Sequence, residues 1–163
     1  MEVSSTVALI HKMQQSGGKV RPRDLESALA KPPEVLVVED DDLYRELVVS
    51  SLKLANFGCR GVSQSAEMET ALSEQEADIV VLDLNLGEED GLVIARYLRE
   101  TRPFLGVVIM TVRNMVEERI EGLAMGADVY LVKPVDIREL VSVIRNLSRR
   151  VMECRASLPG WSG

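Results

Sequence analysis

Short apolar runs recur along the chain from residue 34 onward and alternate with segments of helical periodicity. The runs are Val35–Val38 (VLVV), the weaker 59–62 (CRGV), Ile79–Leu82 (IVVL), Val107–Met110 (VVIM) and Val129–Val132 (VYLV). Uninterrupted apolar runs of this length are typical of strands that are buried on both faces of a sheet. We therefore predict five strands.

The segments between these runs carry hydrophobic residues at helical spacing. They predict helices over about residues 42–56, 65–74, 91–100, 115–125 and 136–153. Ser65 and Asp136 are the expected N-cap residues of the second and fifth helices. Gly58 and Gly126 are expected to end the first and fourth.

Strands that alternate with helices need crossover connections, and these produce a parallel sheet with helices on both faces. The predicted fold is therefore α/β, with a five-stranded, parallel, doubly wound sheet. Ligands of such sheets bind beyond the carboxyl ends of the strands, near the point where the strand order reverses. The residues just after each apolar run are thus the candidates for function.

The pattern divides the chain into residues 1–33, 34–153 and 154–163. Pro32–Pro33 marks the first boundary. The first part has helix-like stretches at 6–15 and 23–30 but no visible chemistry, so it is interpreted as an extension or linker, with a docking element as the alternative. The last part is interpreted as a tail that could start a linker to an effector domain.

Composition narrows the function classes. Hydrophobic residues make up 46% and charged residues 28% of the chain, which is typical of a globular protein. The net charge of −7 disfavours direct binding to nucleic acid or to an anionic membrane. Two cysteines and the absence of a signal-peptide pattern at the N-terminus favour a cytoplasmic location without a membrane span.

Polar residues directly follow four of the five runs. Glu39 and Asp40 follow the first, Asp83 the third, Thr111 the fourth and Lys133 the fifth. Each alone is more often a helix cap or a surface residue, but the set brings three carboxylates to one sheet edge. Clustered carboxylates repel one another, and an all-oxygen site favours Mg²⁺ as the compensating ion. The ammonium of Lys133 and the hydroxyl of Thr111 are suited to contact phosphoryl oxygens, and Asp83 would be the nucleophile.

The segments VLVVEDD, IVVLDLNLGEEDG, VVIMT and GADVYLVKP resemble the signature segments of response-regulator receiver domains, over about residues 34–150. The resemblance implies the flavodoxin-like (CheY-like) receiver fold. It also implies that Asp83 is the phosphoacceptor and that Mg²⁺ is held by Glu39, Asp40, Asp83 and the backbone carbonyl of Asn85.

The same resemblance assigns phosphoryl binding to Thr111 and Lys133, and makes Thr111 and Tyr130 the pair that moves on phosphorylation. It implies a cis peptide bond between Lys133 and Pro134. Core packing is the alternative interpretation of Tyr130.

Three residues depart from the family pattern. Gly87 stands where proline is common, which is expected to loosen the loop after Asp83. Val112 replaces a residue that is usually small, and Glu39 replaces the commoner aspartate. None of the three removes a required functional group.

Three functions compete. The first is a signalling switch phosphorylated by a sensor histidine kinase or a phosphotransfer protein, with no enzymatic activity beyond self-phosphorylation and slow autodephosphorylation. The second is a metal-dependent phosphatase, but such enzymes typically need a second aspartate where Asn85 stands. The third is a phosphorylation-independent interaction module, which the intact acid, threonine and lysine set disfavours.

The segment VEERIEGLAMGADVYLVKPVDIREL most resembles receivers joined to winged-helix (OmpR/PhoB-type) transcription factors. This implies control of transcription and a homodimer promoted by phosphorylation, with a stand-alone receiver as the alternative. Val129 and Val143 stand where that subfamily usually has an aspartate and an arginine, so they form either an apolar contact or part of the core. The expected interface residues are Arg119, Asp128, Val129, Glu139, Val143 and Arg150.

Overall fold

The computed structural model describes residues 31–157 together with His11 and Gln15. By compactness the chain divides into Met1–Pro32 and Pro33–Gly163. Both helix-like stretches predicted before residue 31 lie outside the described residues, except that His11 and Gln15 are helical. The predicted tail is described only as far as residue 157.

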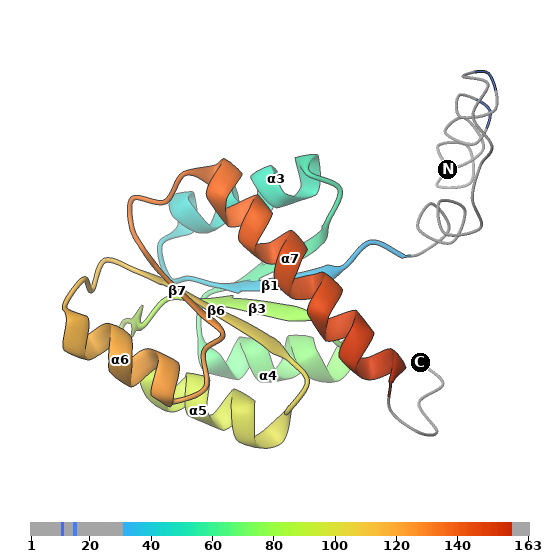
Figure 1. The fold of residues 1–163 in the computed structure, drawn as a ribbon. Helices are drawn as coiled ribbons and strands as arrows, with labels where there is room; N and C mark the ends of the chain where they lie inside the picture. The colour runs from blue at the N-terminus through green and yellow to red at the C-terminus, as the bar shows by residue number, and fades with distance from the viewer. Residues whose placement is uncertain (1–10, 12–14, 16–30, 158–163) are drawn as a thin grey trace. The chain divides into compact units, whose positions relative to one another are not determined.

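The core of the second unit is a parallel five-stranded sheet (Figure 1). Its strand order is β2-β1-β3-β6-β7, as the doubly wound prediction requires. The order reverses between β1 and β3, so a crevice is expected at their carboxyl ends. The strands are β1 (Glu34–Val38), β2 (Gly58–Val62), β3 (Ile79–Leu82), β6 (Gly106–Thr111) and β7 (Val129–Val132).

Helices cover both faces of this sheet (Figure 1). On one face lie α3 (Asp42–Leu54) and α7 (Ile137–Ala156). On the other lie α4 (Ser65–Glu74), α5 (Gly91–Thr101) and α6 (Val116–Ala124). Alternate strand residues point to opposite faces, so Leu36 and Val80 join one buried cluster while Val35 and Val81 join the other.

Two helix ends differ from the sequence prediction. The residue with positive φ after α3 is Asn56 (φ 68°), and Gly58 instead opens β2. Asparagine tolerates this left-handed conformation better than most residues. Ser65 is the first helical residue of α4 rather than its cap, while Asp136 caps α7 as predicted by accepting the N–H of Arg138.

The loop after Asp83 is more ordered than the sequence suggested. It forms an antiparallel hairpin of β4 (Asn85–Leu86) and β5 (Glu89–Asp90). Gly87 turns the chain at φ 64°, a conformation that proline cannot adopt. Glycine at 87 therefore suits this turn, and a loosened loop stays a prediction.

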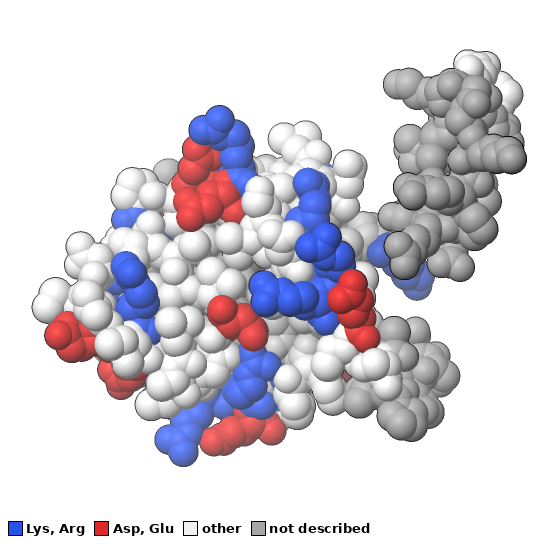
Figure 2. Space-filling view, in the orientation of Figure 1, with Lys and Arg blue, Asp and Glu red and all other residues white. Residues whose placement is uncertain are grey.

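Two general properties bear on partners. None of the helices within residues 31–157 is long and apolar enough to cross a membrane. On the face shown in Figure 2, Lys and Arg side chains are interspersed with Asp and Glu and form no continuous basic surface.

Candidate functional site

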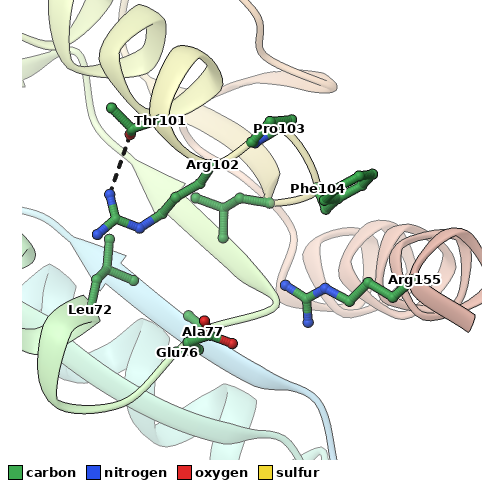
Figure 3. A pocket seen from close by; sticks show the side chains of 9 residues that line it. Leu72, Glu76, Ala77, Thr101, Arg102, Pro103, Phe104 and Arg155 are labelled. Atoms are coloured by element: carbon green, nitrogen blue, oxygen red, sulfur yellow. Dashed lines mark hydrogen bonds between the residues drawn. The ribbon is translucent and has the colours of Figure 1, made fainter. Parts of the chain in front are cut away.

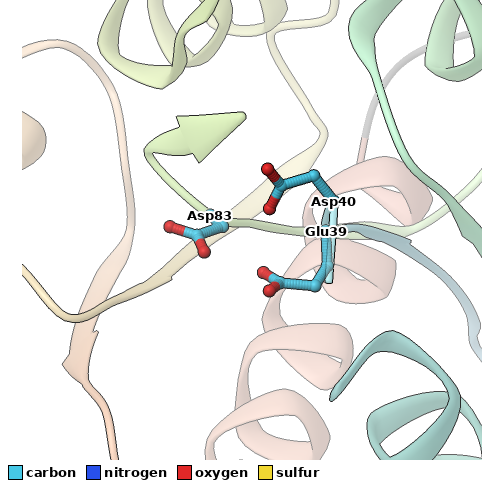
Figure 4. Close-up of side chains that lie close together, drawn as sticks. All are labelled: Glu39, Asp40 and Asp83. Carbon is cyan, nitrogen blue, oxygen red and sulfur yellow. The ribbon is translucent and has the colours of Figure 1, made fainter. Parts of the chain in front are cut away.

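Three carboxylates converge beyond the carboxyl ends of β1 and β3 (Figure 4). Glu39 and Asp40 directly follow β1, and Asp83 directly follows β3. One ligand oxygen from each lies within 4.8 Å of the others. Glu39 and Asp83 are only 2% and 6% exposed, whereas Asp40 faces solvent. The structure thus brings the three acids together where the strand order reverses.

A single lysine lies against the two buried acids. Lys133 Nζ is 2.9 Å from Asp83 Oδ2 and 3.1 Å from each carboxylate oxygen of Glu39. The Lys133 N–H donates to the Thr111 carbonyl, and the peptide bond to Pro134 is cis, as the resemblance implied. The ammonium also lies 4.2 Å from the ring centroid of Tyr44, a cation–π contact.

Burial and charge perturb the titration of this cluster. Burial, followed by the hydrogen bond and charge of Asp83, raises the pKa of Glu39 to about 7. Burial alone would raise the pKa of Asp83 as well, but hydrogen bonds from Glu39, the Asn85 N–H and Lys133 outweigh it and lower that pKa. Burial would lower the pKa of Lys133, yet the two carboxylates outweigh burial and raise it.

The donor set suits a hard divalent cation. One ammonium contacts two of the three carboxylates, so the cluster carries excess negative charge in a partly buried place. Oxygen donors without His or Cys select Mg²⁺ or Ca²⁺, and a site of few ligands favours the more hydrated Mg²⁺. The residues present therefore fit a magnesium ion, with the exposed Asp40 on the solvent side.

The two predicted switch residues are connected through Arg113. Thr111 is fully buried at the end of β6, and its hydroxyl accepts the N–H of Arg113 at 3.4 Å. The Tyr130 hydroxyl donates to the carbonyl of Arg113 at 2.9 Å. Within the described residues, the Thr111 hydroxyl has no hydrogen bond to the carboxylates.

Sequence reasoning missed two residues that shape this site. Tyr44, on α3, lies against Lys133, and nothing in its helical spacing distinguishes it from a core residue. Arg113 reaches from the end of β6 to the hairpin, where its Nε donates to Asn85 Oδ1 at 2.9 Å. The sequence signal for Arg113 was its position two residues after Thr111, but an arginine in a loop is usually solvated, so this position alone did not indicate a contact with the site.

The predicted interface residues lie apart from this cluster. Arg119, Glu139 and Arg150 are exposed on α6 and α7. Val129 and Val143 are half-buried and pack against the sheet's hydrophobic core.

Asp128 has partners within its own chain. Its carboxylate pairs with Arg99 at 2.7 Å and accepts the Val107 N–H at 2.8 Å.

A separate cavity of about 190 Å³ opens at the opposite edge of the sheet (Figure 3). Its lining includes Leu72, Ala77, Phe104 and Arg155. These residues come from the ends of α4 and α7 and from the segments that precede β3 and β6, so they lie at the amino ends of the strands. The cavity is therefore not part of the carboxylate site.

Comparisons with known proteins agree with this geometry. The family model of the response regulator receiver domain matches residues 35–145. The transcriptional regulatory protein AruR of Pseudomonas aeruginosa is 42% identical over 79% of this chain, and the transcriptional regulatory protein GltR of the same organism is 38% identical over 71%. The matches cover 54% and 49% of those proteins, so the chain spans about half of their length.

The fold has counterparts among solved structures. A CheY-like response regulator receiver domain protein from Methanospirillum hungatei superimposes with a TM-score of 0.68 at 22% identity. The match covers 75% of this chain and 98% of that one.

Proposed function

This chain belongs to the response regulator receiver domain family, and on that premise we propose that it is a phosphorylation-activated switch of a two-component system. Asp83 would accept a phosphoryl group with Mg²⁺. The observation that carries this proposal is the position of the Asp83 carboxylate, which contacts Lys133 and lies close to two further acids where the strand order reverses. A metal-dependent phosphatase is disfavoured because Asn85 supplies no second carboxylic acid.

In this proposal the chain's residues have distinct roles. Glu39, Asp40, Asp83 and the Asn85 carbonyl would hold Mg²⁺, which offsets negative charge on the phosphoryl oxygens when bound. Lys133 and Thr111 would contact those oxygens.

An Asp83 oxygen bonds to phosphorus as the phosphorus–nitrogen bond of a phosphohistidine breaks, and the imidazole leaves. The donor would be a sensor histidine kinase or a phosphotransfer protein in the cytoplasm. Slow hydrolysis by water would then reset the switch.

The output is inferred from the relatives. Two similar proteins are named transcriptional regulatory proteins, so we propose that the output of this receiver is the control of transcription. A stand-alone or phosphorylation-independent receiver is the alternative. A phosphorylation-independent receiver would bind its partner equally well with and without a phosphoryl analogue, whereas a switch would not.

Phosphorylation of the purified chain tests the main proposal. Acetyl phosphate with Mg²⁺ should add one acid-stable, alkali-labile phosphoryl group, and Asp83→Ala should abolish it. Asp42→Ala is the matched control, because Asp42 is an exposed acid that pairs only with Arg45 among the described residues. Labelling that persists in Asp83→Ala would refute the assignment.

We further infer that phosphorylation promotes a symmetric dimer through α6, β7 and α7. Exposed charges at Arg119, Glu139 and Arg150 are available for contacts between subunits, whereas Asp128 would have to share its carboxylate with Arg99. Exposed ion pairs contribute only about 0–1 kcal/mol each. The dimer would therefore depend on apolar contact, for which α6 offers exposed Ile120.

Sedimentation tests this interface. Val143→Arg should weaken dimerisation in the presence of beryllofluoride, because it places a charge where the partner offers an apolar surface. A Val143→Arg variant that dimerises as well as the wild type would exclude Val143 from the interface.

A further inference from the structure

The N-terminus of α4 is capped from a distant part of the chain. The first N–H groups of a helix lack partners within the helix, and the residue before it usually supplies one. Gln64, which precedes α4, makes no such side-chain hydrogen bond. Instead, the Glu89 carboxylate accepts the Ser65 N–H at 3.0 Å and also the Ser65 hydroxyl. An acid from the β4–β5 hairpin thus caps a helix that begins 24 residues earlier.

The same hairpin carries part of the proposed magnesium site. Asn85, whose carbonyl is a proposed ligand, pairs with Asp90 in the hairpin ladder. At the turn, the Gly87 N–H donates to Asp40 Oδ2 at 3.1 Å. The turn of the hairpin therefore contacts Asp40, one of the proposed metal-binding acids, and its outer strand contacts the N-terminus of α4.

A two-stranded hairpin of this size has little stability of its own. Its position must therefore come from its ties to the rest of the fold. Those ties include the Gly91 N–H, which donates to the Leu84 carbonyl at 3.0 Å, and Arg113, which bonds Asn85. Leu86 is buried in the core, and Asp90 ties the outer strand to α5 by accepting the Leu92 N–H at 3.0 Å. The Glu89–Ser65 contact ties that strand to α4.

We propose that Glu89 is a positioning residue for the magnesium site. By capping α4 it fixes the β4–β5 hairpin, and with it the Asn85 carbonyl and the Gly87 N–H, against the carboxylates. This inference rests on the proposed function, because it assumes that the cluster binds Mg²⁺. It adds a residue outside the metal-binding set, acting through the loop rather than on the ion.

Glu88 provides a matched control. It occupies the same turn and carries the same charge, but its side chain is exposed and makes none of the hairpin's ties. Glu88→Ala and Glu89→Ala therefore remove one negative charge from nearly the same place. Only the second removes the cap of α4.

The experiment measures Mg²⁺ affinity from the thermal midpoint as Mg²⁺ is titrated, and measures amide exchange of residues 85–90 without metal. Glu89→Ala should weaken Mg²⁺ binding about tenfold, which is the size seen when groups that orient metal ligands are lost. Hairpin amides should exchange about tenfold faster, as expected from the loss of a capping interaction. Glu88→Ala should change either quantity less than about twofold, since surface charges contribute little.

Two further variants keep the test decisive. Glu89→Gln retains an oxygen for the Ser65 N–H and should recover most of the affinity even if Glu89→Ala folds poorly. Ser65→Ala keeps the N–H but loses the hydroxyl, so its effect should be intermediate.

A variant Glu89→Ala with a lower midpoint but unchanged Mg²⁺ affinity and hairpin exchange would overturn the inference, because Glu89 would then only stabilise α4. A wild type without any Mg²⁺-dependent shift would refute the proposed function instead. In that case the metal-free hairpin exchange still decides whether Glu89 holds the loop.

Discussion

An acid is buried beside a base at both the amino ends and the carboxyl ends of the strands (the amino edge and the carboxyl edge), but only at the carboxyl edge does one base contact two buried acids, with a third acid nearby. At the amino edge, Asp78 accepts from Arg155 at 2.5 Å and from the Glu34 N–H at 2.8 Å. Both side chains of that pair are largely buried, with 15% and 18% exposed. At the carboxyl edge, Lys133 alone faces Glu39 and Asp83, with Asp40 nearby.

This contrast separates a structural ion pair from a functional one. The Asp78 pair joins the start of β1 to the end of α7, which is a structural role. The carboxyl-edge cluster has more acids than bases, and excess buried charge is costly unless a partner offsets it. Such an imbalance is expected where a ligand supplies the missing charge.

The largest expected effect is the response to Mg²⁺. A ligand at 100 times its dissociation constant stabilises the folded state by about 2.7 kcal/mol. The thermal midpoint of the wild type should therefore rise with Mg²⁺, and that of Asp83→Asn should rise much less. Asp78→Asn is the control from the other edge, and its midpoint should rise as much as that of the wild type. An equal rise in Asp83→Asn would contradict the assignment of Asp83 to the metal site.

The second effect is a change in the stability of the metal-free protein when an acid is removed from either edge. Asp78→Ala should lower the free energy of unfolding by roughly 2 kcal/mol, because it leaves the Glu34 N–H and Arg155 without this acceptor. Glu39→Gln should instead leave the metal-free protein at pH 8 as stable as the wild type or more so, because the raised pKa of Glu39 means that its ionised form is disfavoured in the folded state. Urea unfolding without metal measures both. Equal losses in the two variants would mean that the carboxyl edge is not strained by its charge.

The third effect is a pH dependence confined to the carboxyl edge. The pKa of Glu39 is about 7 in the folded protein, against 4.5 for a free glutamate. The protonated side chain therefore stabilises the folded state fully below pH 4.5, and this stabilisation is lost as the pH rises through about 7. The pKa of Asp83 is lowered, so the stability that its ionised carboxylate contributes is lost only in more acidic solution, below this pH window.

The metal-free protein should thus lose roughly 2 kcal/mol of stability between about pH 5 and pH 8. Over the same window the Mg²⁺-induced rise should grow, since deprotonated carboxylates bind the ion. Thermal midpoints at several pH values measure both trends. Glu39→Gln should flatten the metal-free slope, and an unchanged slope in that variant would place the titration elsewhere.

Sequence patterns predicted the sheet and the ends of its strands because both depend on local signals. Buried strands require continuous apolar runs, and side chains that follow parallel strands must meet at one edge. Asp83, Glu39 and Lys133 could therefore be placed together before any contact was known.

Contacts between distant segments could not be predicted in this way. The capping of α4 by Glu89 depends on how a hairpin packs against a helix, and Glu89 has no feature that separates it from Glu88 in the sequence. The hairpin turn at Gly87 could not be predicted for a related reason. A glycine in a loop permits either a loose chain or a tight turn, and tertiary contacts decide between them.

The smallest expected effect concerns access to the unbalanced edge. Val112 directly follows Thr111, and 61% of its surface is exposed at the rim of the site. Its two methyl groups are expected to narrow the approach to Asp83. Val112→Ala should therefore speed phosphorylation by acetyl phosphate and hydrolysis by about threefold each, which corresponds to less than about 1 kcal/mol of activation free energy. Val93→Ala, on α5 and 65% exposed, makes the same chemical change away from Thr111 and should alter neither rate. Rates in Val112→Ala that match those of Val93→Ala would show that this position does not limit access to Asp83.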